Sequence, residues 1–112
     1  MMRMALLAAM FTLVAEPSSA EVLTTECTST SGRSVYTLSF DLTANKGLIR
    51  YRFMGQDITY RARIDQNDTD GILGRAVFES SRSGEVRGNP FSFYYSKAKK
   101  EFKELNTKAR CK

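Results

Sequence analysis

Apolar and polar residues alternate along much of the chain, a pattern typical of β-strands that bury one face. The clearest run covers residues 35–42, where every second side chain is large and apolar or aromatic. Runs 49–53 and 58–64 alternate in the same way, and turn-forming residues at 43–46 and 55–56 separate the three runs. The sequence therefore predicts three consecutive antiparallel strands joined by short turns.

The positions of the turns also predict a register for these strands. Gly55 at the first central position of a two-residue loop suits a type II′ turn, which pairs Phe53 with Ile58. The same scheme pairs Phe40 with Ile49 across the preceding turn. This register gathers the large apolar side chains of all three strands on one face, and a slip of one residue would scatter them.

Three more segments have the character of strands. They cover residues 22–28, 74–81 and 91–96, and Asn89-Pro90 marks a break before the last of them. With the central strands, they predict an all-β fold, a small antiparallel meander that closes as a barrel or a sandwich. No internal repeat or linker divides the chain, so a single β-domain is expected.

Two structures are compatible with the residues that follow the last of these strands. Helical spacing favours a short C-terminal helix, since it relates Ala98, Phe102, Leu105 and Ala109. The alternative is a hairpin in which residues 97–100 form the turn and a strand returns from Glu101. The hairpin is the preferred interpretation, and either structure would carry the last residues back towards the first strand.

Residues 1–20 match a secretory signal peptide. Arg3 precedes an apolar run at 5–15, and Ser18 and Ala20 place small residues before a cut after Ala20. The apolar run is too short for a membrane-spanning helix, which needs about 20 residues. We therefore expect a mature domain, residues 21–112, that is secreted or periplasmic and has no transmembrane segment.

The two cysteines, Cys27 and Cys111, lie near the two ends of this mature domain. An exported protein meets an oxidising compartment, where such a pair forms a disulfide. Closing a loop of almost the whole domain would stabilise the fold by about 4–5 kcal/mol on the chain-entropy view. The pair lacks the C-x-x-C spacing of redox enzymes, so a structural disulfide is expected.

The composition limits the chemistry that the chain can perform. Among 112 residues there are 17 Lys and Arg, 12 Asp and Glu and no His, which gives a net charge of +5. The absence of His excludes the usual Ser–His and Cys–His nucleophile pairs and most zinc sites. We therefore expect no catalytic residue, no cofactor and no metal, with a small hydrolase that uses only Asp, Tyr and Arg as an alternative.

Residues 65–71 are rich in Asp and Asn and resemble part of a calcium-binding loop. In the EF-hand frame, however, Gln66 and Val77 occupy the first and twelfth positions, where carboxylates are needed. A polar turn is therefore the better interpretation of this segment.

The polar face of the central strands carries most of the informative residues. The predicted register places Arg50 directly opposite Arg61, although like charges that face each other across a ladder are destabilising. Asp57 and Asp65 are expected at strand ends, too far away to neutralise them, whereas Glu79 is expected within reach. The residues expected on this face are Thr37, Ser39, Arg50, Arg52, Thr59, Arg61 and Arg63.

Guanidinium groups bind phosphate, sulfate or carboxylate in a bidentate manner, so four of them among hydroxyl groups indicate an anion-binding surface. The alternative is a solvated basic face that serves solubility only. The binding residues predicted are Arg50, Arg52, Arg61, Arg63, Thr37 and Thr59.

The chain resembles a group of small exported bacterial proteins of unknown function. The similarity lies in Cys27–Gly32, Tyr36-Thr37-Leu38, Asp41-Leu42, Gly74, Phe91-Ser92-Phe93 and Cys111. In that group an early and a terminal cysteine bracket a β-meander with a late hairpin. The resemblance implies a fold and a compartment but no activity.

Three functions are compatible with these features. The first is a non-enzymatic binding module whose Arg face engages an anionic partner: a lipid head group, an acidic polysaccharide, a nucleic acid or an acidic protein. The second is an exported enzyme inhibitor or immunity-type protein that acts through a loop, either 65–74 or 83–90. The third is the small hydrolase without histidine.

Overall fold

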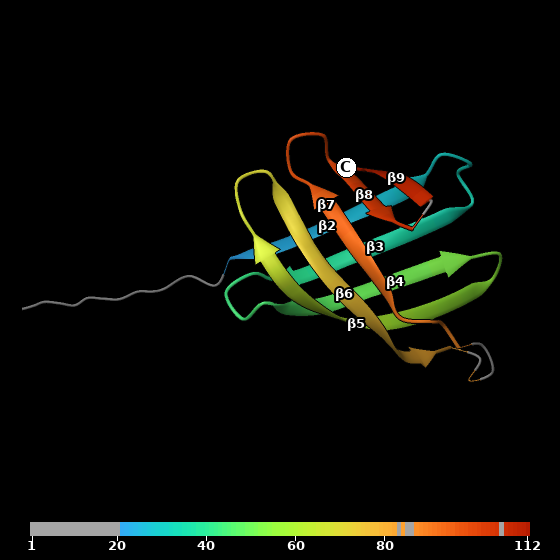
Figure 1. Ribbon diagram of the computed structural model, residues 1–112. Helices are drawn as coiled ribbons and strands as arrows, with labels where there is room; N and C mark the ends of the chain where they lie inside the picture. The colour runs from blue at the N-terminus through green and yellow to red at the C-terminus, as the bar shows by residue number, and fades with distance from the viewer. Residues whose placement is uncertain (1–20, 83, 85–86, 106) are drawn as a thin grey trace, which may run out of the picture.

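The computed structural model describes residues 21–112 except 83, 85, 86 and 106 (Figure 1). The signal peptide expected at residues 1–20 lies outside the described residues. The described part of the chain forms eight strands and no helix. They are β2 (Val22–Ser29), β3 (Ser34–Asp41), β4 (Lys46–Phe53), β5 (Gln56–Asn67), β6 (Gly71–Ser81), β7 (Phe91–Ser96), β8 (Glu101–Glu104) and β9 (Thr107–Cys111).

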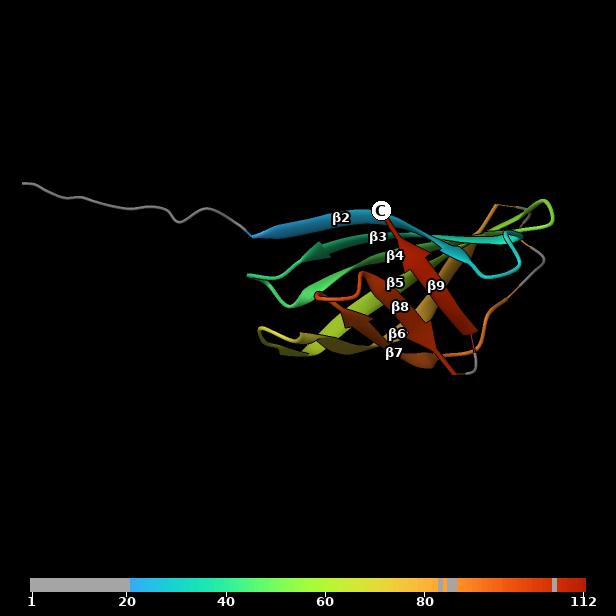
Figure 2. The same ribbon diagram turned by 90° about the horizontal axis from the view of Figure 1, so that it is seen from above.

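Each strand pairs antiparallel with the next, and β9 pairs with β2, so the sheet closes into a barrel. The closing contact joins Cys27–Ser29 to Ala109–Cys111. Figures 1 and 2 show a flattened barrel in which β6, β7 and β8 cross in front of β2, β3 and β4. The prediction of an all-β meander that closes on itself is confirmed, in its barrel form.

The predicted register between β4 and β5 is wrong by two residues. Phe53 pairs with Gln56 rather than with Ile58, so the turn consists of Met54 and Gly55. Both residues have positive φ, 49° and 82°, as a type I′ turn requires. This turn matches the right-handed twist of the strands, and it places the glycine second instead of first.

The register between β3 and β4 differs from the prediction in the same way. Phe40 lies opposite Gly47 rather than Ile49, because the loop consists of residues 42–45. Asp41 stabilises this tighter loop by accepting hydrogen bonds from the backbone N–H groups of Thr43 and Ala44, at 3.1 and 3.0 Å.

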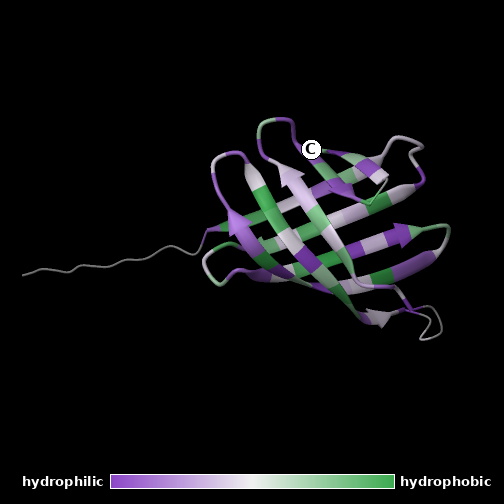
Figure 3. Cartoon of the chain, in the orientation of Figure 1, coloured by the Kyte–Doolittle hydropathy of each residue, from purple (hydrophilic) through white to green (hydrophobic). Residues whose placement is uncertain are grey.

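A shift of two residues keeps every side chain on its predicted face, because strand side chains alternate with period two. The apolar residues of β3, β4 and β5 therefore still form one wall of the core, and Figure 3 shows hydrophobic and hydrophilic bands alternating along the strands. Aromatic rings fill the centre: the ring centroids of Tyr36 and Phe102 lie 4.9 Å apart, and those of Phe40 and Phe93 lie 5.4 Å apart.

In the part of the C-terminal region that the structure describes, there are two hairpins and no helix. The hairpin of β7 and β8 confirms the preferred interpretation, but the strand that begins at Glu101 ends at Glu104 instead of running on to Cys111. The chain reverses again, with positive φ at Leu105, and β9 then pairs with both β8 and β2. The helical spacing was misleading because Phe102 and Ala109 face the core from two different strands.

The predicted disulfide between Cys27 and Cys111 is present. The two cysteines lie directly opposite each other across β2 and β9, and both are buried. The covalent bond therefore closes the barrel at the same place as the last pair of strands.

Candidate anion-binding face

All six predicted binding residues lie on the outer face of β3, β4 and β5. Thr37 lies beside Arg50 and Arg50 beside Thr59, in one row across three strands. The predicted pair of Arg50 and Arg61 does not form, because the shift in register places Arg61 opposite Leu48. This arrangement relieves the repulsion that the predicted register implied.

Arg50 forms the closest ion pair of this face. Its Nε donates a hydrogen bond of 2.8 Å to Asp57, and its Nη2 binds the second carboxylate oxygen. Hydrogen bonds from Arg50 lower the pKa of Asp57 below its ordinary value. Arg82 adds a longer contact of 3.9 Å to the same carboxylate.

Arg52 belongs to a second group of paired charges. Its Nη2 donates to Glu26 and to the hydroxyl of Thr37, both at 3.2 Å. Lys112 also contacts Glu26, at 2.9 Å, and its hydrogen bond is the main reason why the pKa of Glu26 is lowered. Glu26 supplies one negative charge to two cations, so this group keeps a net charge of +1, but the Nη2 of Arg52 is already engaged by Glu26 and Thr37.

The remaining two predicted arginines make weaker ion pairs. The Nε of Arg61 lies 3.4 Å from Glu79, and the Nε of Arg63 lies 3.0 Å from Asp65. All four side chains are largely exposed, so each pair contributes less than about 1 kcal/mol. The expectation that Asp57 and Asp65 would not reach an arginine is wrong, because both lie within β5. Asp57 is opposite Arg52 and diagonal to Arg50 across β4 and β5, and Asp65 follows Arg63 by two residues on the same strand.

A different set of cations lies together without equal compensation. Lys46 is opposite Arg63 across β4 and β5, and Arg63 is opposite Arg75 across β5 and β6. The three residues form one row across adjacent strands, and neighbouring strands are about 4.8 Å apart. Asp41 lies opposite Lys46 across β3 and β4, and Asp65 forms an ion pair with the Nε of Arg63, so two carboxylates stand against the three cations.

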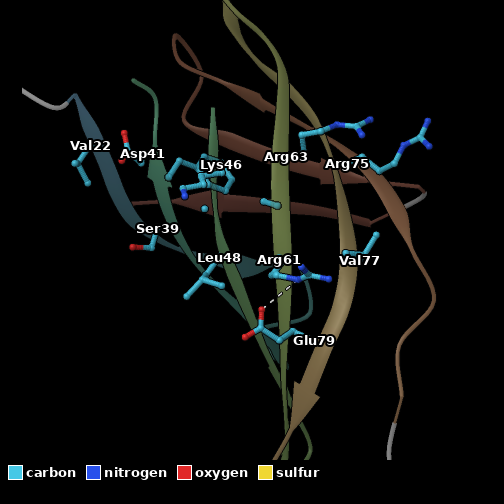
Figure 4. Close-up of a pocket in the computed structure, with 13 residues that line it drawn as sticks. Val22, Ser39, Asp41, Lys46, Leu48, Arg61, Arg63, Arg75, Val77 and Glu79 are labelled. Atoms are coloured by element: carbon cyan, nitrogen blue, oxygen red, sulfur yellow. Dashed lines mark ion pairs between the residues drawn. The ribbon is translucent and has the colours of Figure 1, made fainter. Parts of the chain in front are cut away.

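This row borders a groove on the outer face of β3 to β6 (Figure 4). The groove has a volume of about 650 Å³. Figure 4 shows Arg63 and Arg75 extending to the same side of it, whereas Lys46 extends towards β3. Leu48 and Val77 flank Arg61 lower in the groove, and both are exposed, by 45% and 37%.

Of the groove residues missing from the sequence-based site, Lys46, Arg75, Leu48 and Val77 matter most for binding. Lys46 was assigned to a turn, although it is the first residue of β4. Arg75 lies in a segment that was correctly expected to be a strand, and its alternation with buried Ala76 would have placed it outside. Leu48 and Val77 gave no signal, because an isolated apolar residue on a polar face is common.

The segment 65–74 is a hairpin rather than a projecting loop. Asn67 pairs with Ile72, so only the residues between β5 and β6 form the turn. One carboxylate oxygen of Asp68 accepts hydrogen bonds from the backbone N–H groups of Asp70 and Gly71, at 2.9 and 3.1 Å. The acidic pattern therefore serves the turn, as the sequence indicated. The other proposed loop, 83–90, lies partly outside the described residues.

No protein-family model, curated protein or solved structure matches this chain. Within residues 21–112, apart from the gaps given above, there is no helix that could span a bilayer. The function is therefore inferred from the geometry of the barrel and its groove.

Proposed function

We propose that this protein is an exported, non-enzymatic binding module that holds an anionic partner in the groove on the outer face of β3 to β6. The observation that carries the proposal is the row of Lys46, Arg63 and Arg75 on three adjacent strands. Like charges directly opposite each other destabilise a sheet. A bound anion would convert this unfavourable arrangement into a favourable one.

The chemistry of the side chains supports an anion rather than a neutral ligand. The groove is lined by Lys46, Arg61, Arg63 and Arg75 against two carboxylates, those of Asp41 and Glu79. Two guanidinium groups that extend in the same direction can each offer paired N–H donors to phosphate, sulfate or carboxylate oxygens.

The proposed site contains only some of the binding residues expected from the sequence. Arg50 and Arg52 lie outside the lining of the groove, and both are engaged in ion pairs, with Asp57 and Glu26 respectively. Arg61 and Arg63 stay in the site, where Arg75 joins them.

Export is supported by the disulfide between Cys27 and Cys111. Such bonds persist in oxidising compartments, and a small domain that buries a modest core gains most from them. The compartment agrees with the signal peptide expected at residues 1–20.

The two other functions have less support in the geometry. An inhibitor that acts through residues 65–74 would need a projecting loop, and this segment is a tight hairpin. A hydrolase of the glycosidase type would need two carboxylates within about 10 Å of each other. The two carboxylates of the groove, Asp41 and Glu79, come from β3 and β6, which β4 and β5 separate, and Glu79 is paired with Arg61.

The test is retention on a heparin resin, which presents a dense array of sulfate and carboxylate groups. The double variant Arg63→Glu/Arg75→Glu should elute at a clearly lower salt concentration than the wild type, because it loses the paired guanidinium groups. The matched control is Lys99→Glu/Lys108→Glu, which changes the net charge equally at exposed positions outside the groove.

Elution of both double variants at the same salt concentration would contradict the proposal. It would mean that the resin senses the net charge of +5 rather than a local site. Circular dichroism of each variant checks that the barrel is intact.

A further inference from the structure

The groove contains an apolar part beside its cationic part. The row of Leu48, Arg61 and Val77 crosses β4, β5 and β6 on the same face as the cation row, two residues further along each strand. The two rows are therefore about 7 Å apart. An anion held by Arg63 and Arg75 would have this second row directly beside it.

The second row presents mainly carbon atoms to a ligand. Leu48 and Val77 keep 45% and 37% of their surface exposed. Arg61 lies between them, with its Nε held by Glu79 at 3.4 Å (Figure 4). The aliphatic stem of an arginine covers apolar surface well, so the three residues form one continuous strip.

The size of the groove fits a small molecule. Its volume of about 650 Å³ lies within the range of about 300–1,000 Å³ that is typical of ligand sites. Leu48 and Val77 are exposed by 45% and 37%, less than the side chains of Arg61 and Arg63, which are exposed by 65% and 66%. A surface that inserts into a bilayer has the opposite order, with apolar side chains projecting furthest.

From these observations we infer that the ligand of the groove is a single-chain amphiphile with an anionic head, bound as a monomer. Arg63 and Arg75 bind the head, and Val77, the stem of Arg61 and Leu48 contact the chain. This inference rests on the proposed anion-binding function and adds the chemical class of the ligand.

Isothermal titration of the barrel with decyl phosphate, below its micelle concentration, tests the inference. Methyl phosphate serves as the chainless arm, and vesicles that contain an anionic phospholipid serve as the bilayer arm. We expect decyl phosphate to bind at least tenfold more tightly than methyl phosphate, since each methylene removed from water adds about fourfold. Vesicles should bind less than the monomer at equal accessible phosphate.

A double variant in the apolar row tests the contact with the hydrocarbon chain of the ligand separately from the contact with its anionic head. Leu48→Gln/Val77→Thr should lose most of the preference for decyl phosphate but keep its retention on heparin. The matched control is Leu73→Gln, which removes a similarly exposed leucine from the outer face of β6 but outside the groove. Amide chemical shifts of the wild type should move at Leu48, Arg63 and Val77 when decyl phosphate is added, which keeps the test valid if a variant fails to fold.

The outcomes are distinguishable. Equal affinity for decyl and methyl phosphate would overturn the amphiphile inference and leave the anion site intact. Binding to vesicles without binding of the monomer would also overturn it, in favour of membrane docking. A third outcome would overturn both the inference and the proposed function. In it, neither phosphate binds, and the two double variants elute from heparin at the same salt concentration.

Discussion

At the scale of single residues, the least expected position is Met54. It has a φ of 49° and is 76% exposed, so an L-residue with a large apolar side chain occupies a left-handed position in water. Asn-Gly is the pair that favours a type I′ turn most strongly. Met54→Asn should therefore stabilise the barrel by about 0.5–1 kcal/mol, measured by urea unfolding.

The control for this prediction is Met54→Gln, which keeps a flexible side chain of similar length. It lacks the short amide that favours the left-handed conformation, so its stability should stay within about 0.5 kcal/mol of the wild type. Equal stabilities of the Asn and Gln variants would show that the backbone conformation at this turn costs little.

Tyr36 combines a buried aromatic ring with a hydrogen-bonded hydroxyl group. Its hydroxyl donates a hydrogen bond of 3.0 Å to Glu104, while its ring is packed in the core. Burial, and then the charge of Glu104, raises the pKa of Tyr36 far above its ordinary value. Burial also raises the pKa of Tyr60 and of Tyr95.

These shifts predict a loss of stability in alkali. The folded state favours the neutral phenol, so its contribution is complete below the unfolded pKa of about 10 and decreases as the pH rises above it. The free energy of unfolding should fall between pH 9 and pH 11. Tyr36→Phe should cost about 1–2 kcal/mol at pH 7 but fall less steeply above pH 10. Parallel curves for the two proteins would contradict this assignment.

At the scale of strands and turns, the sequence predicted faces better than registers. Alternation assigns each side chain of β3, β4 and β5 to the core or to solvent, and it cannot tell apart two registers that differ by two residues. Turn geometry decides between them, and here it depended on a methionine with positive φ, for which the sequence gives no signal. The same applied to Leu105, the residue that divides the C-terminal region into two strands.

Gly47 makes the close approach of β3 and β4 possible. A Cβ atom at this position would clash with the carbonyl oxygen of Ser39 and would lie 2.8 Å from the ring of Phe40. Both partners are fixed, because one is backbone and the other is fully buried. Gly47→Ala should therefore cost about 1–3 kcal/mol.

Denaturant unfolding measures this cost, with Ser39→Ala as the control. Ser39 is exposed on the outer face of the neighbouring strand, and its substitution should change stability by less than about 0.5 kcal/mol. A loss for Gly47→Ala no larger than that of the control would mean that β3 and β4 can separate easily at this point.

At the scale of the whole molecule, the candidate site depends on how β4, β5 and β6 are paired. The sequence identified the outer face and two arginines of the groove, Arg61 and Arg63. It could not identify their neighbour Arg75, because this requires the register between β5 and β6, which contains two irregularities. One of them is a bulge near Glu79, the residue that pairs with Arg61.

The closure itself predicts a strong dependence on the disulfide. The ladder between β2 and β9 contains three residue pairs, whereas the ladder between β3 and β4 contains eight. Cys27 and Cys111 close a loop with a sequence separation of 84. The double variant Cys27→Ala/Cys111→Ala should lose about 4 kcal/mol of stability.

Equilibrium unfolding with and without a thiol reductant provides the control for this prediction. The reductant should destabilise the wild type and leave the double variant unchanged. A loss below about 1 kcal/mol in both cases would mean that the short ladder closes the barrel without help from the covalent bond.

The position of this bond also determines how the molecule would respond to force. A pull applied before Cys27 and after Cys111 passes through the sulfur atoms and bypasses almost the entire chain. Only the part of β2 before Cys27 lies outside the loop and can peel from β3. Under tension the part of the barrel between the two cysteines should not extend until the disulfide is reduced.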